Sequence, residues 1–264
     1  MTAGSCRLTI LLVLASIAGV ASARPDVPWD GAYLGANFGE GSGSSCNSWS
    51  LNGAGFDPAA ASDFNNRICS SSSAFVGGVQ VGENFQYKRF VWGIGADLDF
   101  ESAKNLSQSL KYSGVQPPPG TYVYSSKQNP GGFAIVAPRI GYGGDTWFPY
   151  LRAGAIIAEG SHDSVLVYTP AGATKSTASF SGGKDFTSAG WVVGGGFELG
   201  LNGAWSITAE YLHANLGKGS DSTSACSGLA SACAPFSGIS FDNGHEGFSA
   251  NMFRVGITYW FGYW

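Results

Sequence analysis

Long apolar runs and charged residues are both scarce in this chain, and each shortage excludes a class of protein. The longest apolar run, residues 8–20, is shorter than the roughly 18 residues that a membrane-spanning helix needs. Charged residues make up 12% of the chain, against about 25% in an average soluble domain. The three histidines, His162, His213 and His245, do not stand at metal-ligand spacing with cysteine, so the sequence predicts no metal site.

The amino terminus has the pattern of a secretion signal. Arg7 precedes the apolar run, and the small residues Ala21-Ser22-Ala23 resemble a signal-peptidase site, which predicts a cleaved signal peptide over residues 1–23. The remaining residues, 24–264, show no composition break and are expected to form one domain. Cleavage removes Arg7 from 14 basic residues and leaves 13 against 18 acidic ones, a balance that does not favour binding to nucleic acid.

Alternation with a period of two is the main structural signal. It is clearest over residues 90–101, where Phe90, Trp92, Ile94, Leu98 and Phe100 alternate with small or acidic residues. The same alternation predicts strands over residues 29–39, 74–87, 132–142, 148–159, 186–201, 204–216 and 248–261. The gaps between these eight segments are about 34, 2, 30, 5, 26, 2 and 31 residues, which is the wiring of an outer-membrane barrel with tight periplasmic turns and long outer loops. The fold class is therefore all-β: an eight-stranded antiparallel up-and-down transmembrane β-barrel.

The predicted turns and their aromatic neighbours support this wiring. Asn202-Gly203 is a strong hairpin signal, and Lys88-Arg89 and residues 143–147 supply the other tight turns. Aromatic residues gather beside these turns and are expected to form one interfacial girdle: Tyr87, Phe90, Trp92, Tyr142, Trp147, Phe148, Trp205, Tyr259 and Phe261. The acid Glu83 falls on the lipid-facing side, unless a bulge turns it inward.

The opposite face of the strands carries most of the charge. The side chains expected to form a lumen charge network are Asp97, Asp99, Glu101, Arg139, Arg152, Glu198, Glu210 and Arg254. Side chains just fill an eight-stranded barrel, so buried charges there have to pair, and a structural plug is the favoured interpretation over a narrow ion pathway. Glu198 and Glu210 are candidate cross-strand neighbours that need an arginine between them, and the sequence does not say which.

Catalytic interpretations of these residues are weaker. Acids at strand spacing follow from the periodicity of any polar lumen, so glycosidase-like chemistry is not favoured. His162-Asp163-Ser164, expected in a loop, and His213 with Glu210 are the available combinations for a lipid hydrolase, and solvated or structural roles are the simpler expectation. The glycine-rich runs do not match a dinucleotide motif, so no cofactor is predicted.

Four cysteines follow the predicted cleavage site, and a secreted protein with an even count is expected to form disulfides. We favour Cys46 with Cys69 and Cys226 with Cys233, because each pair closes within its own predicted loop. Cross-pairing between the two loops remains an alternative, because the first and last strands of a barrel are neighbours.

Several segments carry a family resemblance: WDGAYLGANFG from Trp29, GGVQVGENFQ from Gly77, FVWGIGADLDF from Phe90, PRIGYGG from Pro138, LRAGAI from Leu151, GWVVGGGFELGLNGAWSITAEYLHANLG from Gly190 and FRVGITYWF from Phe253. With them the chain resembles the small outer-membrane β-barrel family that includes the Omp25/Omp31-type immunogenic surface proteins of alphaproteobacteria. The resemblance implies an eight-stranded barrel, surface exposure, at most weak pore activity and no catalytic residues. The closing strand is similar to the signal read by the outer-membrane assembly machinery, although Gly262 to Trp264 extend past the usual end.

The expected function is a structural and surface-interactive role in the bacterial outer membrane, among lipid and lipopolysaccharide. A narrow porin-like channel, a lipid-A-modifying enzyme and a soluble barrel like a lipocalin are the alternatives. The loop partner is unknown. Aromatic residues in the long loops, especially Tyr122 and Tyr124, favour hairpins that continue above the membrane over contacts with a partner.

Overall fold

The protein consists almost entirely of β-strands. The computed structural model describes residues 29–53, 66–102, 106–114, 120–175, 178–201, 204–217, 222–228 and 233–261. The eight long strands are β1 (Gly31–Gly53), β2 (Asn66–Tyr87), β3 (Phe90–Ser102), β5 (Gly120–Tyr142), β6 (Trp147–Pro170), β7 (Ala178–Gly200), β8 (Trp205–Leu216) and β11 (Ile239–Phe261). The short elements are β4 (Leu106–Gly114), β9 (Ser222–Ala225), β10 (Ser227–Gly228) and the 3-10 helix η1 (Ala234–Phe236). No helix in these ranges is long and apolar enough to cross a bilayer.

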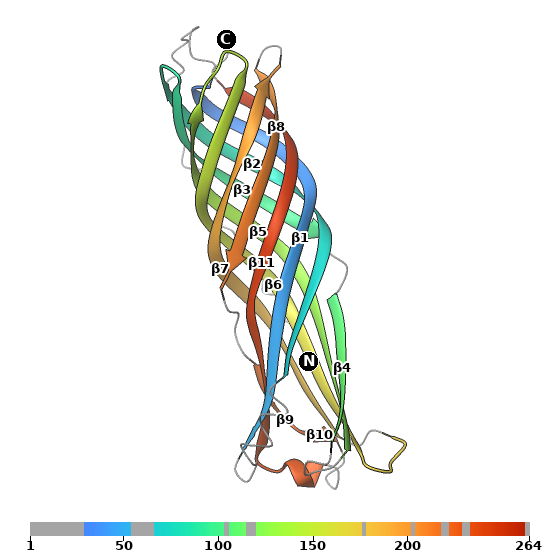
Figure 1. Ribbon diagram of the computed structural model, residues 1–264. Helices are drawn as coiled ribbons and strands as arrows, with labels where there is room; N and C mark the ends of the chain where they lie inside the picture. The colour runs from blue at the N-terminus through green and yellow to red at the C-terminus, as the bar shows by residue number, and fades with distance from the viewer. Residues whose placement is uncertain are drawn as a thin grey trace, which may run out of the picture.

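The long strands close into a cylinder. Each pairs with the next in the order β1-β2-β3-β5-β6-β7-β8-β11, and β1 also pairs with β11. This closing seam runs antiparallel from Ala32 opposite Phe261 to Gly53 opposite Ile239. Figure 1 shows the resulting tall barrel with strongly tilted strands. The predicted eight-stranded antiparallel barrel is confirmed.

Tight turns gather at one end of the cylinder, which we call the turn end. Lys88 and Arg89 join β2 to β3, and Lys88 adopts a positive φ of 56°. The backbone N–H of Gly143, in the turn between β5 and β6, donates a hydrogen bond of 2.8 Å to the carbonyl oxygen of Arg89. Three sequence predictions lie outside the described residues: the signal peptide over residues 1–23, the Asn202-Gly203 turn, and the assignment of Gly262 to Trp264.

The strands extend much further toward the opposite, loop end than the sequence predicts. The first strand was expected to stop at residue 39 but continues to Gly53, and β6 continues to Pro170 instead of ending at residue 159. The extension of β1 is rich in Ser and Gly and lacks apolar alternation, whereas that of β6 carries the apolar run 165–168; the backbones of both pair in register with neighbouring strands. The expectation that residues 162–164 form a loop is wrong, because they lie within β6. The expected hairpins above the membrane are present, with β4 paired to β5 at the loop end (Figure 1).

The outer wall is apolar and bears two aromatic belts. The turn-end belt includes Phe85, Tyr87, Phe90, Trp92, Tyr142, Trp147, Phe197, Trp205, Tyr259 and Phe261. The loop-end belt, which the sequence reasoning missed, is formed by Phe38, Phe75, Phe100, Trp191, Tyr211 and Phe253. On β3 the belts are about eight residues apart, which at strand rise and a tilt of about 40° gives roughly 20 Å. One girdle assignment is wrong: Phe148 is fully buried inside the barrel, because it follows the turn by one residue on the inward side of the pleat.

The interior is arranged in layers along the barrel axis. The floor, at the turn end, is Trp29, Tyr33, Val91, Phe148, Tyr150 and Trp260. A charged layer follows, described below. Above it the middle layer is apolar: Val76, Phe133, Ile135, Ala137, Ile156, Val192, Leu212, Ala214, Leu216 and Met252. The cap, at the loop end, is Tyr122, Tyr124, Leu166, Tyr168, Ala178, Phe180, Phe236 and Phe241.

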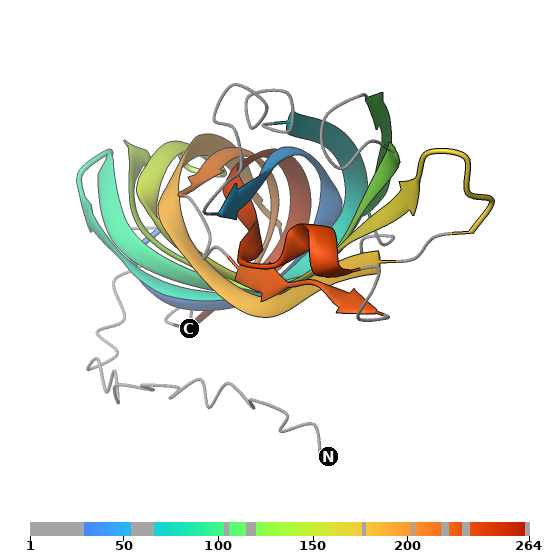
Figure 2. The same cartoon turned by 90° about the horizontal axis from the view of Figure 1, so that it is seen from below.

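The cap is a second hydrophobic core, built where the sequence predicts long loops with hairpins that continue above the membrane. Phe236, on η1, packs edge-on against Tyr168 and Phe180, with ring centroids 5.0 and 5.3 Å apart. Figure 2, which views the barrel from the loop end, shows η1 lying across the opening. The interior is therefore covered at both ends by aromatic side chains.

Candidate functional site

Seven charged side chains from six strands meet inside the barrel, and we call them the network. They are Asp97 and Asp99 on β3, Arg139 on β5, Arg152 on β6, Glu198 on β7, Glu210 on β8 and Arg254 on β11. None is more than 6% exposed. Their position follows from the strand period: Trp92 and Ile94, on the other face of β3, are 42% and 53% exposed on the outer wall. This orientation decides between a membrane barrel and a soluble barrel, which would bury its apolar face.

Arg254 is the central base of the network. Its guanidinium donates to Asp99 Oδ2 at 2.6 Å and to Glu210 Oε2 at 2.5 Å, and it lies 3.4 Å from Asp97 Oδ2. These acids belong to β3 and β8, so the side chain of Arg254 connects its own neighbour β8 with a strand across the lumen. Charged groups so deeply buried persist only where each has an opposite charge and hydrogen bonds.

Arg152 forms the second bridge across the lumen. Its Nη2 donates to Asp97 Oδ2 at 2.7 Å, and its Nη1 donates to Glu210 Oε1 at 3.2 Å. The hydroxyl of Tyr150 donates to the same Glu210 oxygen at 3.0 Å. Glu210 therefore receives hydrogen bonds from two guanidinium groups and one phenol, which compensates for its removal from water.

Arg139 and Glu198 form a separate branch near the floor. Their closest charged atoms are 3.5 Å apart, and Arg139 Nε donates to Asn84 Oδ1 at 2.8 Å. The guanidinium carbon of Arg139 lies 4.1 Å from the centroid of the Tyr33 ring, within range of a cation–π contact. Glu198 also accepts hydrogen bonds from the Ser206 hydroxyl and from Trp260 Nε1, the latter at 3.0 Å.

The register explains how two acids on adjacent strands are accommodated. Glu198 lies opposite Thr208, and Glu210 lies opposite Gly196, so the two glutamates are diagonal neighbours. Each takes a different arginine, Arg139 for Glu198 and both Arg152 and Arg254 for Glu210. The sequence suggested that one arginine lies between Glu198 and Glu210, but the structure pairs each glutamate with its own arginines.

Glu101 is the one proposed network residue that does not join the others. It lies on the lumen face of β3 beyond Asp99, level with the apolar middle layer, and it makes no ion pair within the described ranges. At this level most interior positions above the network carry apolar side chains, so Glu101 has apolar neighbours instead of network arginines. The network itself contains four acids and three bases, so one formal negative charge is in excess when all are ionised.

Several supporting residues were not identified from the sequence. Trp29 precedes β1 and folds into the floor, where its indole N–H donates to the carbonyl oxygen of Gly144 at 2.8 Å. Tyr150 and Trp260 share the inward side of the pleat with Arg152 and Arg254, respectively. This shared face could have been predicted from the sequence, because strand residues an even number of positions from a lumen arginine also face the interior.

The histidine-based catalytic combination is separated by the barrel wall. His213 lies on the outer face of β8, where its Nδ1 is 2.8 Å from Asn251 Oδ1 and its ring is 5.5 Å from that of Trp191. Glu210 points into the lumen, so the two side chains lie on opposite faces of one strand. Nor do the described residues contain a cluster of three or more His, Cys, Asp or Glu side chains suited to a metal ion.

Both favoured cysteine pairings are present. Cys46 on β1 lies directly opposite Cys69 on β2, and the two form a disulfide. Cys226 and Cys233 form the second disulfide, which lies against the cap just before η1. The alternative cross-pairing between the two loops is therefore not what this structure contains.

Comparison with known proteins assigns the family. The profile of the outer membrane protein beta-barrel domain matches residues 9–261. The chain belongs to this outer-membrane β-barrel family. The 31 kDa outer-membrane immunogenic protein of Brucella melitensis biotype 1 is 30% identical over 191 residues, which cover 72% of each chain. The protein of the same name from Brucella suis biovar 1 is similar to the same extent. These findings confirm the resemblance to the Omp25/Omp31 type and locate this outer-membrane barrel in the bacterial outer membrane.

Among solved structures, the outer-membrane protein OprG of Pseudomonas aeruginosa is similar at 13% identity and a TM-score of 0.44, covering 89% of this chain and 100% of its own. The attachment invasion locus protein Ail of Yersinia pestis is similar at 12% identity and a TM-score of 0.26, covering 81% and 98%. For an outer-membrane barrel the turn end faces the periplasm and the loop end faces outward.

Proposed function

We propose that this protein is a structural and surface-presenting component of the outer membrane whose lumen is not an open channel. The observation that carries the proposal is the sequence of layers inside the barrel: floor, network, middle layer and cap. An eight-stranded barrel leaves only a narrow lumen for side chains, and these four layers obstruct it at successive heights. Ions crossing it would have to displace buried, paired charges.

The stalk, meaning the part of the barrel beyond the loop-end belt, supports the surface-presenting part of the proposal. On β6 the last exposed large apolar residue is Ile157, and the strand continues for about 13 residues to Pro170. At strand rise and a tilt of about 40°, this raises the loops by roughly 30 Å above the apolar band. The related Brucella proteins are named immunogenic, which agrees with exposed loops.

The apolar outer wall and its two aromatic belts indicate which parts of the membrane contact the barrel. Acyl chains of outer-membrane lipid contact the apolar wall, and the two belts lie at the headgroups, with lipopolysaccharide at the outer one. The alternating closing strand β11, which ends at Phe261, is the segment that the outer-membrane assembly machinery is proposed to bind.

Conductance of the purified protein in planar bilayers tests the closed lumen. We expect no stable single-channel steps, because the network and both aromatic layers block the pore. Stable steps whose size changes in Asp97→Asn or Arg152→Gln would instead establish the porin-like alternative, because both substitutions change the charge of the network inside the lumen.

Loss of the gene product tests the structural role. Cells without the protein are expected to release periplasmic proteins and to become sensitive to detergent, and the wild-type chain should reverse both effects. A variant with shortened outer loops and an intact barrel should also restore integrity, while losing surface recognition. Normal integrity in the deletion strain would contradict the structural role.

A further inference from the structure

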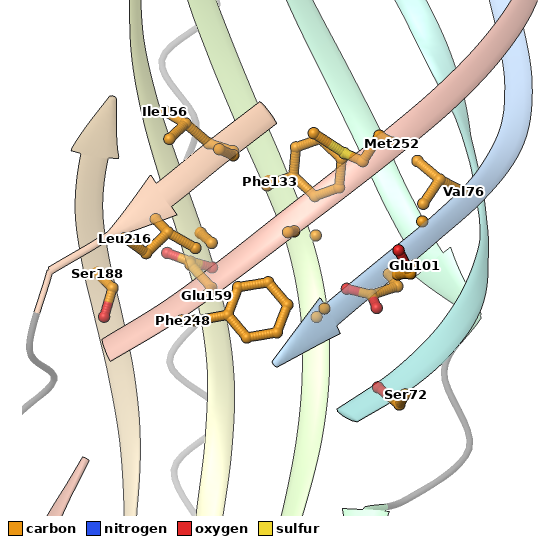
Figure 3. A pocket seen from close by; sticks show the side chains of 18 residues that line it. Ser72, Val76, Glu101, Phe133, Ile156, Glu159, Ser188, Leu216, Phe248 and Met252 are labelled. Atoms are coloured by element: carbon orange, nitrogen blue, oxygen red, sulfur yellow. The ribbon is translucent and has the colours of Figure 1, made fainter. Parts of the chain in front are cut away.

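An internal cavity of about 80 Å³ lies in the lumen between the network and the cap. Its walls are mainly apolar, with Phe133, Ile156, Leu216, Phe248 and Met252 among the lining side chains (Figure 3). For comparison, an engineered apolar cavity of about 150 Å³ in another protein binds benzene. About half that volume suits roughly three or four non-hydrogen atoms.

One wall of this cavity carries a carboxylate without a counter-ion. Glu101 lines the cavity, two residues beyond Asp99 on the same face of β3. The three network arginines are engaged by the four network acids, and within the described part of the chain no Lys or Arg pairs with Glu101. A carboxylate in a partly dry, apolar site is stabilised by a cation, and none of the described residues supplies one to Glu101.

A second observation points to a polar ligand in the same cavity. Ser188, on the lumen face of β7, lines the cavity and is 3% exposed, and its hydroxyl has no hydrogen-bond partner among the described residues. Buried hydroxyl groups usually have such a partner, so an unmatched one facing a cavity indicates a polar atom of a guest. Glu159, labelled on the other side of the cavity from Glu101 in Figure 3, adds a second carboxylate to its lining.

We propose that this cavity is a binding site for a short alkylammonium ion, a role that goes beyond the structural function proposed above. The ammonium group pairs with Glu101, and the alkyl chain occupies the apolar space. The lining also includes the aromatic rings of Phe133 and Phe248, a residue type whose ring faces attract cations. An anion would be repelled by Glu101, and a sugar would leave its hydroxyl groups unmatched against the apolar wall.

The experiment uses the full chain in non-ionic detergent micelles with n-propylammonium as the probe. The sequence contains two methionines, Met1 and Met252, so a ¹³C-methyl label on methionine places one reporter in the cavity wall. We expect propylammonium to shift the Met252 methyl resonance saturably in the millimolar range, because a ligand of this size has few atoms to contribute affinity. Propanol, which has the same shape without the charge, should bind about tenfold more weakly.

Two variants and a matched control complete the test. Glu101→Gln should weaken propylammonium binding about tenfold and leave propanol binding unchanged, whereas Glu40→Gln, which removes an exposed acid from the outer face of β1, should change neither. Ala214→Leu fills the cavity and should abolish binding of both. Heat-modifiable migration on a gel verifies that each variant is folded. An unmoved Met252 resonance, or equal binding of propylammonium by the wild type and Glu101→Gln, would overturn the proposal.

Discussion

Replacing Arg254 by methionine removes the central base of the network and should strongly destabilise the barrel. Arg152 still bridges Asp97 and Glu210 in this variant, at 2.7 and 3.2 Å. Asp99, which is 1% exposed, is left without a cation, because among the described residues Arg254 is the base that pairs with it. An uncompensated buried charge costs about 3–5 kcal/mol, so we expect the free energy of unfolding to fall by that amount.

The assay is urea unfolding of the protein reconstituted in lipid vesicles, followed by tryptophan fluorescence. Arg89→Met is the matched control, because Arg89 and Asp145 form an exposed pair with atoms 3.9 Å apart. Such surface pairs contribute about 1 kcal/mol or less, so this variant should stay near the wild type. The double variant Arg254→Met with Asp99→Asn should recover more than half of the loss, because the orphaned charge is gone. If Arg254→Met lost no more stability than Arg89→Met, the inference that the buried network stabilises the barrel would be refuted.

Three further outcomes follow from single residues. Burial raises the pKa of the Tyr124 phenol to about 12, so its contribution to the stability of the cap is complete below pH about 10 and is lost as the pH rises through 12. Protease cleavage at the loop end should therefore increase over that pH range. Tyr124→Phe should remove this pH dependence. Lys88→Gly should raise the free energy of unfolding in urea by about 0.5–1 kcal/mol, because φ is 56° at this position; a loss of stability would mean that the lysine side chain matters more than the turn strain. Glu83→Leu should stabilise the barrel by about 1 kcal/mol in the same assay, because Glu83 is paired with Ile94 on the lipid-facing side; no change would indicate that its carboxylate already reaches water.

The sequence was most informative where burial alternates. Along β3 the contrast between Trp92 or Ile94 outside and Asp97 or Asp99 inside is strong, because lipid and lumen impose opposite preferences on successive residues. This contrast predicted which side chains form the outer wall, the order of the strands and all seven charged residues of the network. Pairing between particular acids and bases was not predictable, because it depends on the stagger between strands and on side-chain reach across the lumen.

Regions without that contrast were predicted poorly. The stalk stands in water outside and encloses aromatic residues inside, yet its strands are rich in Ser and Gly, so the expected segments ended too early. Phe148 lies beside the turn between β5 and β6, where a shift of one residue in register decides whether a side chain joins the outer wall or the floor. The cap depends on η1 and Phe241 folding over β5, β6 and β7, contacts between distant segments that a local pattern does not contain.

The bridges from Arg254 and Arg152 have a mechanical consequence. They join strands that are not neighbours in the ring, β11 to β3 and β6 to β3 and β8, and so act as internal struts between separate parts of the wall. A hollow tube squeezed sideways flattens into an ellipse, whereas one with internal struts keeps a round cross-section. The barrel is therefore built to withstand lateral pressure from the surrounding bilayer without changing shape.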